Sequence, residues 1–190
     1  MPTTTRRPRA DARRNRDRLL TAADELFRER GADASLEAVA KLAGVAIGTL
    51  YGHFPTRRAL IGAVLQDRND ALIEAGHALA GLPPEEALRR WVALSVAHAT
   101  TYRGLTVHLL EGAEDGETDE TSGLYRDCGR MSTVNERVTH AAVESGAIRP
   151  GTTGADVQTL VSACAMVGER VTPEQADRFL AIALRGLLSR

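Results

Sequence analysis

The sequence predicts an all-α protein in which an N-terminal three-helix unit is followed by a six-helix domain. Apolar residues recur at helical spacing, proline and glycine fall between the periodic segments, and alternation of β-branched residues is never sustained over the length of a strand. The chain has 190 residues, of which 43% are apolar, so it can bury a core without metals or disulfides.

The first three predicted helices are one long and two short. The long one covers residues 12–30 and ends at Gly31, a residue that enters the left-handed region at no steric cost. The short helices cover residues 36–42 and 46–53 and are separated by a tight turn at Gly44. This order of elements is the outline of a helix-turn-helix unit.

Six further helices are predicted after this unit, each opened by a capping residue, a proline or a turn. They are expected over residues 57–80, 84–103, 105–112, 122–145, 155–169 and 173–190. We therefore divide the chain into a first domain, 1–58, and a second, 59–190. Within the first domain, residues 1–11 are expected to form a disordered basic arm.

Charge is unevenly distributed along the chain. Residues 1–60 contain 12 Lys and Arg against 7 Asp and Glu, whereas the remainder contains 12 against 18. A basic end on an acidic protein indicates that only the first part meets a polyanion. The alternatives for the opening arginine run are a solvated tail, or an arm that binds a membrane surface or RNA.

Several function classes are disfavoured by what the sequence lacks. No window approaches about 18 uninterrupted apolar residues, and no apolar stretch follows the arginine-rich start, so we expect a cytoplasmic protein without a membrane span. Cys128 and Cys164 are isolated and are expected to be reduced thiols, with a redox switch as the alternative. No metal-ligand spacing, phosphate loop or nucleophile elbow is present, so we expect no cofactor, no metal and no enzyme.

The segment over residues 46–53 is a weak helix by itself. Gly48 and Gly52 each cost about 1 kcal/mol of helix propensity relative to alanine, and the helix is only two turns long. Packing by Val45, Leu50 and Phe54 must therefore hold it. Small residues on its outer face favour a close approach to another molecule, and the second helix of a helix-turn-helix enters the major groove of DNA.

Residues 44–60, with the sequence GVAIGTLYGHFPTRRAL, closely resemble the DNA-binding domain of the tetracycline-repressor (TetR) family. The AADELFRERG run over residues 22–31 is similar to it as well. The specific part is Thr-Leu-Tyr-x-His-Phe with a basic residue three positions after the Phe. The resemblance covers about a quarter of the chain. It implies a helix-turn-helix domain followed by a domain that binds a small-molecule effector and dimerises.

The resemblance also implies roles for individual residues. Tyr51 and His53 would contact phosphates and set the register, and Arg57 would hold a phosphate at the start of the fourth helix. Ile47 and Gly48 lie where family members read bases. The basic arm would add salt-dependent affinity or enter a minor groove. The full expected DNA-binding set is Ser35, Ala46, Ile47, Gly48, Thr49, Tyr51, His53 and Arg57.

Two residues depart from the family pattern. Ala46 lies where family members often have a capping serine, so the expected reading helix has no side-chain cap. Ile47 replaces a commonly polar residue and cannot make a bidentate hydrogen bond to a base. It can still pack on thymine methyl groups, which favours recognition by methyl contact and DNA shape.

The last two predicted helices carry apolar stripes that are expected to form the interface of a homodimer. Two helices from each subunit would make a four-helix bundle, and two-fold symmetry would match a palindromic DNA site. The alternative is that both stripes belong to the core of one chain. The expected interface residues are Val157, Leu160, Val161, Cys164, Phe179, Leu180, Ala183, Leu184 and Leu187.

The fifth predicted helix carries one stripe that mixes aromatic surface with polar tips. Such a stripe suits a pocket that is mostly apolar with a few convergent polar groups, although a packed core is the alternative. We expect the effector pocket to include this stripe and residues of the next two helices. The expected pocket residues are Trp91, Ser95, His98, Tyr102, His108, Glu111, Cys128, Met131 and Asn135.

These observations predict a DNA-binding transcriptional regulator. The most direct interpretation is a repressor that binds double-stranded DNA at a palindromic operator as a homodimer. A small-molecule effector would release it from DNA by favouring a dimer in which the spacing of the two helix-turn-helix units does not match the DNA groove. The alternatives are a transcriptional activator and an effector-independent, architectural DNA-binding protein. An enzyme built on His98, His108, Glu111 and Cys128 lacks any supporting motif.

Overall fold

The computed structural model describes residues 6–107 and 123–188, and this part of the chain is all-α, as predicted. Its only β pairing is an isolated bridge between Ile148 and Leu188. No helix in these two ranges is long and apolar enough to cross a membrane. The described elements are α1 (Arg6–Arg30), α2 (Leu36–Ala43), α3 (Ile47–His53), α4 (Arg57–Ala78), a 3-10 turn η1 (Leu79–Gly81), α5 (Pro84–Ala99), α7 (Gly123–Glu144), α8 (Gly154–Gly168) and α9 (Pro173–Leu187).

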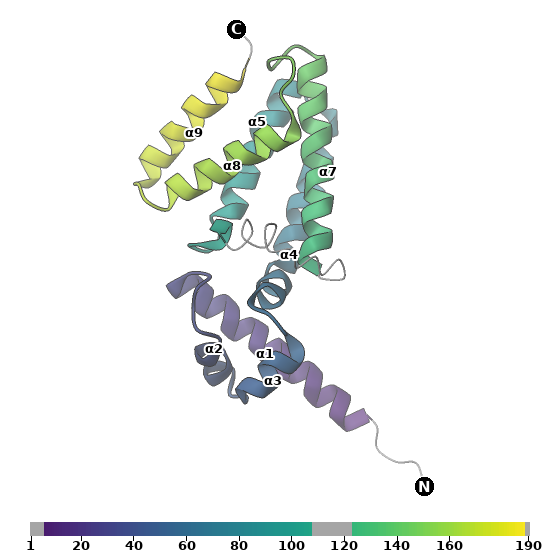
Figure 1. The fold of residues 1–190 in the computed structure, drawn as a ribbon. Helices are drawn as coiled ribbons and strands as arrows, with labels where there is room; N and C mark the ends of the chain where they lie inside the picture. Colours follow the sequence, from purple (N-terminus) through teal and green to yellow (C-terminus); the bar gives the residue numbers. More distant parts are fainter. Residues whose placement is uncertain (1–5, 108–122, 189–190) are drawn as a thin grey trace.

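The helices form two bodies, which we call the lower and the upper body after their places in Figure 1. The lower body contains α1, α2 and α3, the upper body contains α5, α7, α8 and α9, and α4 runs from one into the other. Each body has its own buried apolar cluster. The cluster of the lower body continues through α4 to Leu65, so the packing changes inside α4 rather than at residue 58.

The first helix begins earlier than the sequence suggested. α1 starts at Arg6, so residues 6–11 are helical and do not form the expected disordered arm. Arginine and alanine are good helix formers, and Asp11 pairs with Arg14 one turn later. Pro8 lies in the first turn, where a missing backbone N–H removes no helical hydrogen bond.

The fifth helix ends earlier than expected, at Ala99 rather than at residue 103. The Thr100 hydroxyl donates to the Val96 carbonyl (3.0 Å), and Gly104 adopts φ 79°. This turn carries Tyr102 into the cluster of the lower body, 1% exposed. The next expected helix, 105–112, is helical over its described residues 105–107, and the rest lies outside the described part.

Gly76 allows three helices of the upper body to approach one another closely. A Cβ on Gly76 of α4 would meet Trp91 Cζ3 of α5 at 2.7 Å and would also collide with Val134 of α7. The absence of a side chain at this position therefore sets how near α4 lies to α5 and α7. These same helices line the internal cavity described below.

Candidate nucleic-acid interface and internal cavity

Local capping places the two short helices of the lower body. The Ser35 hydroxyl accepts from Ala38 N (3.3 Å) and donates to the Glu37 carboxylate (2.5 Å), and the latter bond is the main cause that lowers the pKa of Glu37. Gly44 ends α2 at φ 65°, in the left-handed region. A Cβ on Gly44 would meet only the end of the flexible Arg18 side chain, so it is the left-handed backbone conformation that favours glycine here.

The outer face of α3 is open and small. Leu50 is fully buried beneath it, whereas Ile47 and Tyr51 are 37% and 46% exposed. Gly48 and Gly52 follow these two residues, one after each, and no atom comes within 4 Å of a Cβ placed on either glycine. Another molecule can therefore approach the α3 backbone without meeting side chains.

The other predicted DNA-binding residues of this segment flank that face. Ala46 is exposed and makes no side-chain cap, as expected from its lack of a hydroxyl. Thr49 and His53 are half-buried on the side of the helix, and the His53 ring lies 6.2 Å from the Phe54 ring. Both side chains are therefore partly accessible to another molecule.

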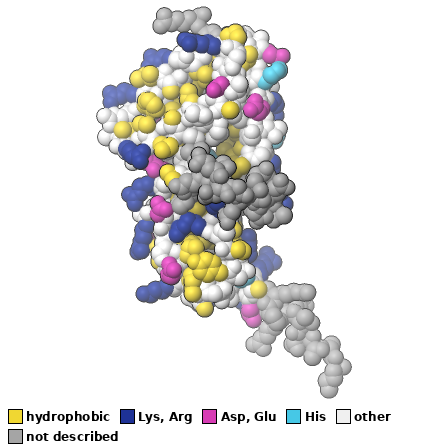
Figure 2. Space-filling view, in the orientation of Figure 1, with side chains coloured by type: hydrophobic (Ala, Val, Ile, Leu, Met, Phe, Trp, Pro, Cys, Tyr) yellow, Lys and Arg dark blue, Asp and Glu magenta, His cyan; other side chains and the backbone are white. Residues whose placement is uncertain are grey.

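An exposed apolar residue of α2 extends this surface. Leu42 is 49% exposed, so the helix-turn-helix carries three exposed large apolar residues, Leu42, Ile47 and Tyr51. Figure 2 shows hydrophobic side chains gathered on the lower body, with Lys and Arg around them. Leu42 was not among the predicted contact residues, because its apolar side chain was expected to be buried beside Val39.

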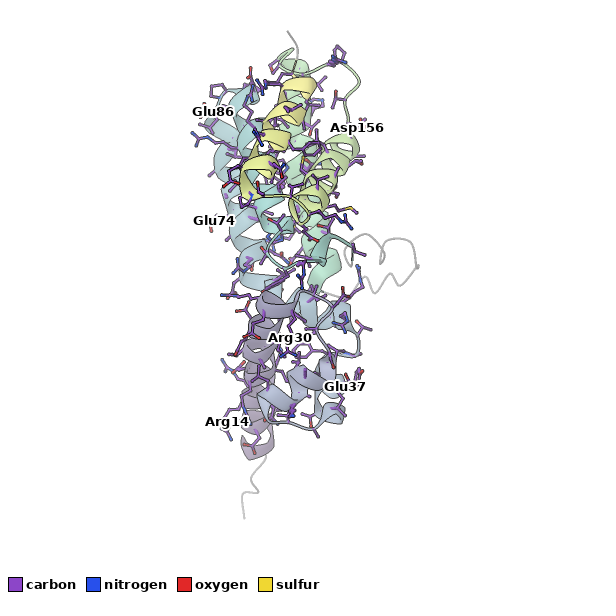
Figure 3. The ribbon with its side chains drawn as sticks, turned by 90° about the vertical axis from the view of Figure 1, so that its left-hand side faces the viewer. Arg14, Arg30, Glu37, Glu74, Glu86 and Asp156 are labelled. Carbon is purple, nitrogen blue, oxygen red and sulfur yellow. The ribbon has the colours of Figure 1, made fainter. Side chains whose placement is uncertain are left out.

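Arginines of α1 lie beside the turn. The Arg16 guanidinium lies over the Phe54 ring, 5.5 Å from its centre, and Arg18 Nη2 donates to the Gly44 carbonyl (3.4 Å). Figure 3 labels Arg14 and Arg30 on α1 in the lower body. The arginines described here therefore belong to a helix, which from residue 6 onward takes the place of the expected disordered arm.

Arg57 differs from its predicted role as an open phosphate clamp. Its Nη1 donates to the carbonyls of Ala32 and Ala34, at 2.7 Å each, and the residue is half-buried. The loop between α1 and α2 leaves these carbonyls without helical partners, and a guanidinium has enough donors to bind both. Arg57 thus holds this loop against the start of α4.

The upper body contains a cavity of about 400 Å³ among α4, α5, α7 and α8. Six of the nine predicted pocket residues line it: Trp91, Ser95, His98, Cys128, Met131 and Asn135. Sequence reasoning missed the contributions of α4, α8 and the segment after α5, which include Leu65, Asn69, Leu72, Thr106, Gly154, Gln158 and Val161. An available signal was the Leu65–Asn69–Leu72 stripe, in which a polar amide interrupts an apolar helix face.

One predicted pocket residue of the described part of the chain does not line this cavity. Tyr102 belongs to the lower body, where its hydroxyl donates to Asp24 Oδ1 (2.6 Å) and its ring meets the Phe27 ring edge-on at 5.7 Å. The prediction was wrong because α5 ends before Tyr102, which removes it from the helical stripe. His108 and Glu111 lie outside the described residues.

Two hydrogen-bonded groups fix the polar part of the wall. Trp91 Nε1 donates to Asn135 Oδ1 (2.9 Å), and Asn135 Nδ2 donates to the Gly154 carbonyl (2.7 Å), so this chain joins α5, α7 and α8. Burial, and after it the charge of Arg68, lowers the pKa of His98 below its usual value. The imidazole is therefore neutral at pH 7.

The predicted dimer residues divide into two groups. Val157, Val161, Cys164 and Leu184 are buried within this chain, so for them the alternative of an intramolecular core is correct. Phe179 is 38% exposed, and Leu160, Leu180, Ala183 and Leu187 are half-buried. Ile182, which is 61% exposed, was missed because it lies outside the predicted stripe of α9, three residues after Phe179. An apolar outer face of α9 therefore remains.

A helix-turn-helix with an open reading face, joined to a helical domain, defines the class of DNA-binding transcriptional regulators. Residues 19–64 match the model for bacterial regulatory proteins of the tetR family, and residues 83–189 match the C-terminal domain of SbtR-like transcriptional regulators. The chain belongs to the TetR family.

Individual relatives agree with this assignment. The chain is 30% identical over 145 residues to the HTH-type transcriptional regulator UidR of Escherichia coli (strain K12), covering 74% of this chain and 72% of UidR. It is 33% identical to the TetR transcriptional regulator SCO0520 from Streptomyces coelicolor, with a TM-score of 0.56 and coverage of 91% and 98%. RolR in complex with resorcinol shares the fold, at 21% identity, a TM-score of 0.61 and coverage of 94% and 89%.

Proposed function

We propose that this protein is a repressor that binds a palindromic operator as a homodimer and is released when a small molecule occupies the cavity of the upper body. One observation carries the release step. Thr106 lines the cavity, while its neighbours Tyr102 and Leu105 are buried in the cluster of the lower body. A single short segment therefore touches both the effector cavity and the domain that presents α3.

Hydrogen bonds tie this segment, residues 100–106, to the lower body. Arg103 O accepts from Ala32 N (2.8 Å), and Tyr102 is bonded to Asp24 of α1. Arg57 binds the Ala32 carbonyl on the same loop. A ligand that displaces this segment would also change the position of the helix-turn-helix relative to α4. It would release DNA if it bound the displaced state of the protein more tightly than the DNA-binding state.

A second copy of the chain is the proposed partner of α9. Phe179 and Ile182 present apolar surface outward, and such surface is commonly buried in stable oligomers. A two-fold dimer would place two α3 helices about 34–36 Å apart, which is one turn of DNA. The DNA-binding set proposed from the structure keeps the predicted residues, with Leu42 added and Arg57 acting mainly by positioning the loop.

Two further points concern the kind of ligand and the cellular location of this protein. RolR carries resorcinol in its crystal structure, which supports a small molecule as ligand for this fold without identifying it. Because the proposed partner is chromosomal DNA, we propose the cytoplasm as the place of action. An activator or an effector-independent DNA-binding protein would share the α3 face, but the shared segment between cavity and helix-turn-helix favours a ligand-responsive repressor.

The test is footprinting of the purified protein on the intergenic DNA that flanks its own coding region. A short, symmetric protected site that is lost on addition of an effector supports the proposal. Coating of the DNA without a defined site indicates an architectural protein, and a defined site that no small molecule affects indicates an effector-independent regulator. Either result would overturn the proposed mechanism.

A further inference from the structure

The cavity contains two buried polar groups that have no hydrogen-bond partner. Asn69 and Thr106 both line it, and they are 0% and 3% exposed. Asn69 Oδ1 and Thr106 Oγ1 are unpaired. Leaving a buried polar group unpaired is unfavourable, because it has lost its hydration without gaining a partner. These atoms therefore indicate where a bound molecule would make its polar contacts.

The orientation of the Asn69 amide is fixed by its other contact. Asn69 Nδ2 donates to Asp127 Oδ2 (2.9 Å), and Gln66 and Arg130 also donate to this carboxylate, at 3.2 Å each. A carboxylate only accepts, so a flipped amide would place two oxygens against each other. The unpaired atom is thus an acceptor, and it needs a hydrogen-bond donor from the ligand.

The charge of the wall limits the ligand further. Among the described lining residues there is no Lys or Arg, and the one acidic residue, Glu136, is exposed. The neutral His98 ring offers no counter-charge, and Leu65, Leu72 and Trp91 supply apolar surface. A carboxylate or phosphate that entered this wall would lose hydration without a compensating ion pair.

We propose that the effector is a small, largely apolar and uncharged molecule with a hydroxyl or N–H group that donates a hydrogen bond to Asn69 Oδ1. The Thr106 hydroxyl provides its second polar contact. This inference rests on the proposed function and specifies the chemistry of the same site. The proposal also assigns a role to Asp127, Gln66 and Arg130. They hold the Asn69 amide in the orientation in which its Oδ1 can accept a hydrogen bond from the ligand.

The chain offers a direct reporter of binding. Trp91 is its only tryptophan and lines the cavity, so tryptophan fluorescence reports on this site alone. The probes are para-tert-butylphenol, its methyl ether para-tert-butylanisole, and para-tert-butylbenzoate. They share one apolar body and differ in whether they donate a hydrogen bond and carry a charge.

Calorimetric titration of the full-length protein at pH 7, with Trp91 fluorescence as a check on the site, decides between these chemistries. We expect the phenol to bind at least tenfold more tightly than the ether, which corresponds to about 1.4 kcal/mol. We expect no detectable binding of the benzoate. Equal affinities of phenol and ether would show that water satisfies the two orphan atoms, and failure of the phenol to bind would equally overturn the inference.

A matched pair of variants tests the contact itself. Thr106→Val and Thr139→Val each remove an unpaired buried hydroxyl at nearly constant shape, and Thr139 does not line the cavity. Thr106→Val should reduce the preference for phenol over ether severalfold, and Thr139→Val should leave it unchanged. Asn69→Leu should abolish the preference. An unchanged preference in both Thr106→Val and Asn69→Leu contradicts the proposed contacts.

These titrations contain no DNA, so their outcome is separate from that of the proposed function. Binding of the phenol without any effect on the operator would leave the ligand chemistry intact and refute release. Release of the operator by a charged compound would support the repressor and refute the ligand chemistry.

Discussion

At the scale of single residues, Arg57 makes contacts within the protein that the sequence did not predict. Its guanidinium bonds two carbonyls of the loop between α1 and α2. The family resemblance suggested a phosphate contact, and the position at a helix N-terminus was compatible with it. The loop carbonyls compete for the same donors, which a sequence pattern does not reveal.

Replacing Arg57 should therefore affect folding as well as DNA binding. Arg57→Ala is expected to lower the free energy of unfolding by about 2 kcal/mol, because two buried carbonyls lose a charged donor. Urea denaturation measures this change. Arg13→Ala, at an exposed arginine of α1, is the control and should leave the denaturation midpoint in place. An unchanged denaturation midpoint in Arg57→Ala would contradict a stabilising role for this residue and leave only the predicted phosphate contact.

Tyr102 should make stability depend on pH at the alkaline end. Burial first, and then the hydrogen bond to Asp24, raises its pKa to about 12. Because the folded protein holds the phenol proton more tightly than the unfolded chain, this contribution is complete below about pH 10. It is lost as the pH rises from about 10 through 12, which lowers the free energy of unfolding by about 2 to 3 kcal/mol.

The measurement is a series of denaturation curves between pH 8 and pH 12 for the wild type and Tyr102→Phe. The variant should start less stable, since Asp24 loses its donor, and its stability should fall less steeply over the alkaline range. Parallel curves for the two proteins would contradict the assignment of Tyr102 to the core of the lower body.

Single residues were predictable from the sequence only where a motif fixed them. The exposed α3 face at Ile47 and Tyr51 follows from the motif and from the need to bury Leu50. The unpaired Oδ1 of Asn69 could not be predicted, because its orientation depends on the packing of α4 against α7. This packing brings Asp127, 58 positions away in the sequence, to the Asn69 amide. A local sequence pattern does not predict a contact between residues so far apart in the chain.

At the scale of elements, α3 combines a poor helix with an open surface. Gly48 and Gly52 cost helix propensity, yet nothing in the structure occupies the space of their missing side chains. Packing of Leu50 and Phe54 compensates for this cost. We propose that DNA occupies that space when the protein is bound to its operator.

Gly48→Ala should therefore separate stability from binding. The added methyl raises helix propensity by up to about 1 kcal/mol and meets no atom of the protein. We expect a thermal midpoint that is equal or higher, together with an operator affinity reduced at least tenfold, measured by fluorescence anisotropy. Gly129→Ala, at an open position of α7, is the control for propensity and should leave the affinity unchanged. Full operator affinity in Gly48→Ala would remove α3 from the interface.

Helix ends were the least predictable elements. α5 stops at Ala99 because the next residues are needed to hold the lower body, a tertiary demand that helix propensity does not contain. α1 begins at Arg6 because arginine and alanine favour the helix, so the segment expected to be an arm continues it from residue 6. The interiors of these helices, with their apolar periodicity, were predicted correctly.

At the scale of the whole molecule, two bodies of different charge share α4 and the segment over residues 100–106. Residues 1–60 contain 12 Lys and Arg against 7 Asp and Glu, and the remainder contains 12 against 18. Figure 3 labels Arg14, Arg30 and Glu37 in the lower body. The excess of basic residues therefore belongs to the part of the chain that would meet phosphates.

The proposed dimer gives a prediction at this scale. Ile182→Asp should place a charge in the apolar face of α9 and convert the protein to a monomer in sedimentation velocity at micromolar concentration. Leu94→Asp, at an exposed position of α5, is the control and should remain dimeric. A dimer that survives Ile182→Asp would move the interface away from α9.

The most direct test of the account is the affinity of the purified protein for the symmetric duplex from its flanking intergenic region, compared with a scrambled duplex at about 0.15 M salt. Fluorescence anisotropy should show binding to the symmetric duplex at least about a thousandfold tighter, as for specific regulators. Equal affinity for the two duplexes would contradict the central claim that the open face of α3 reads DNA sequence.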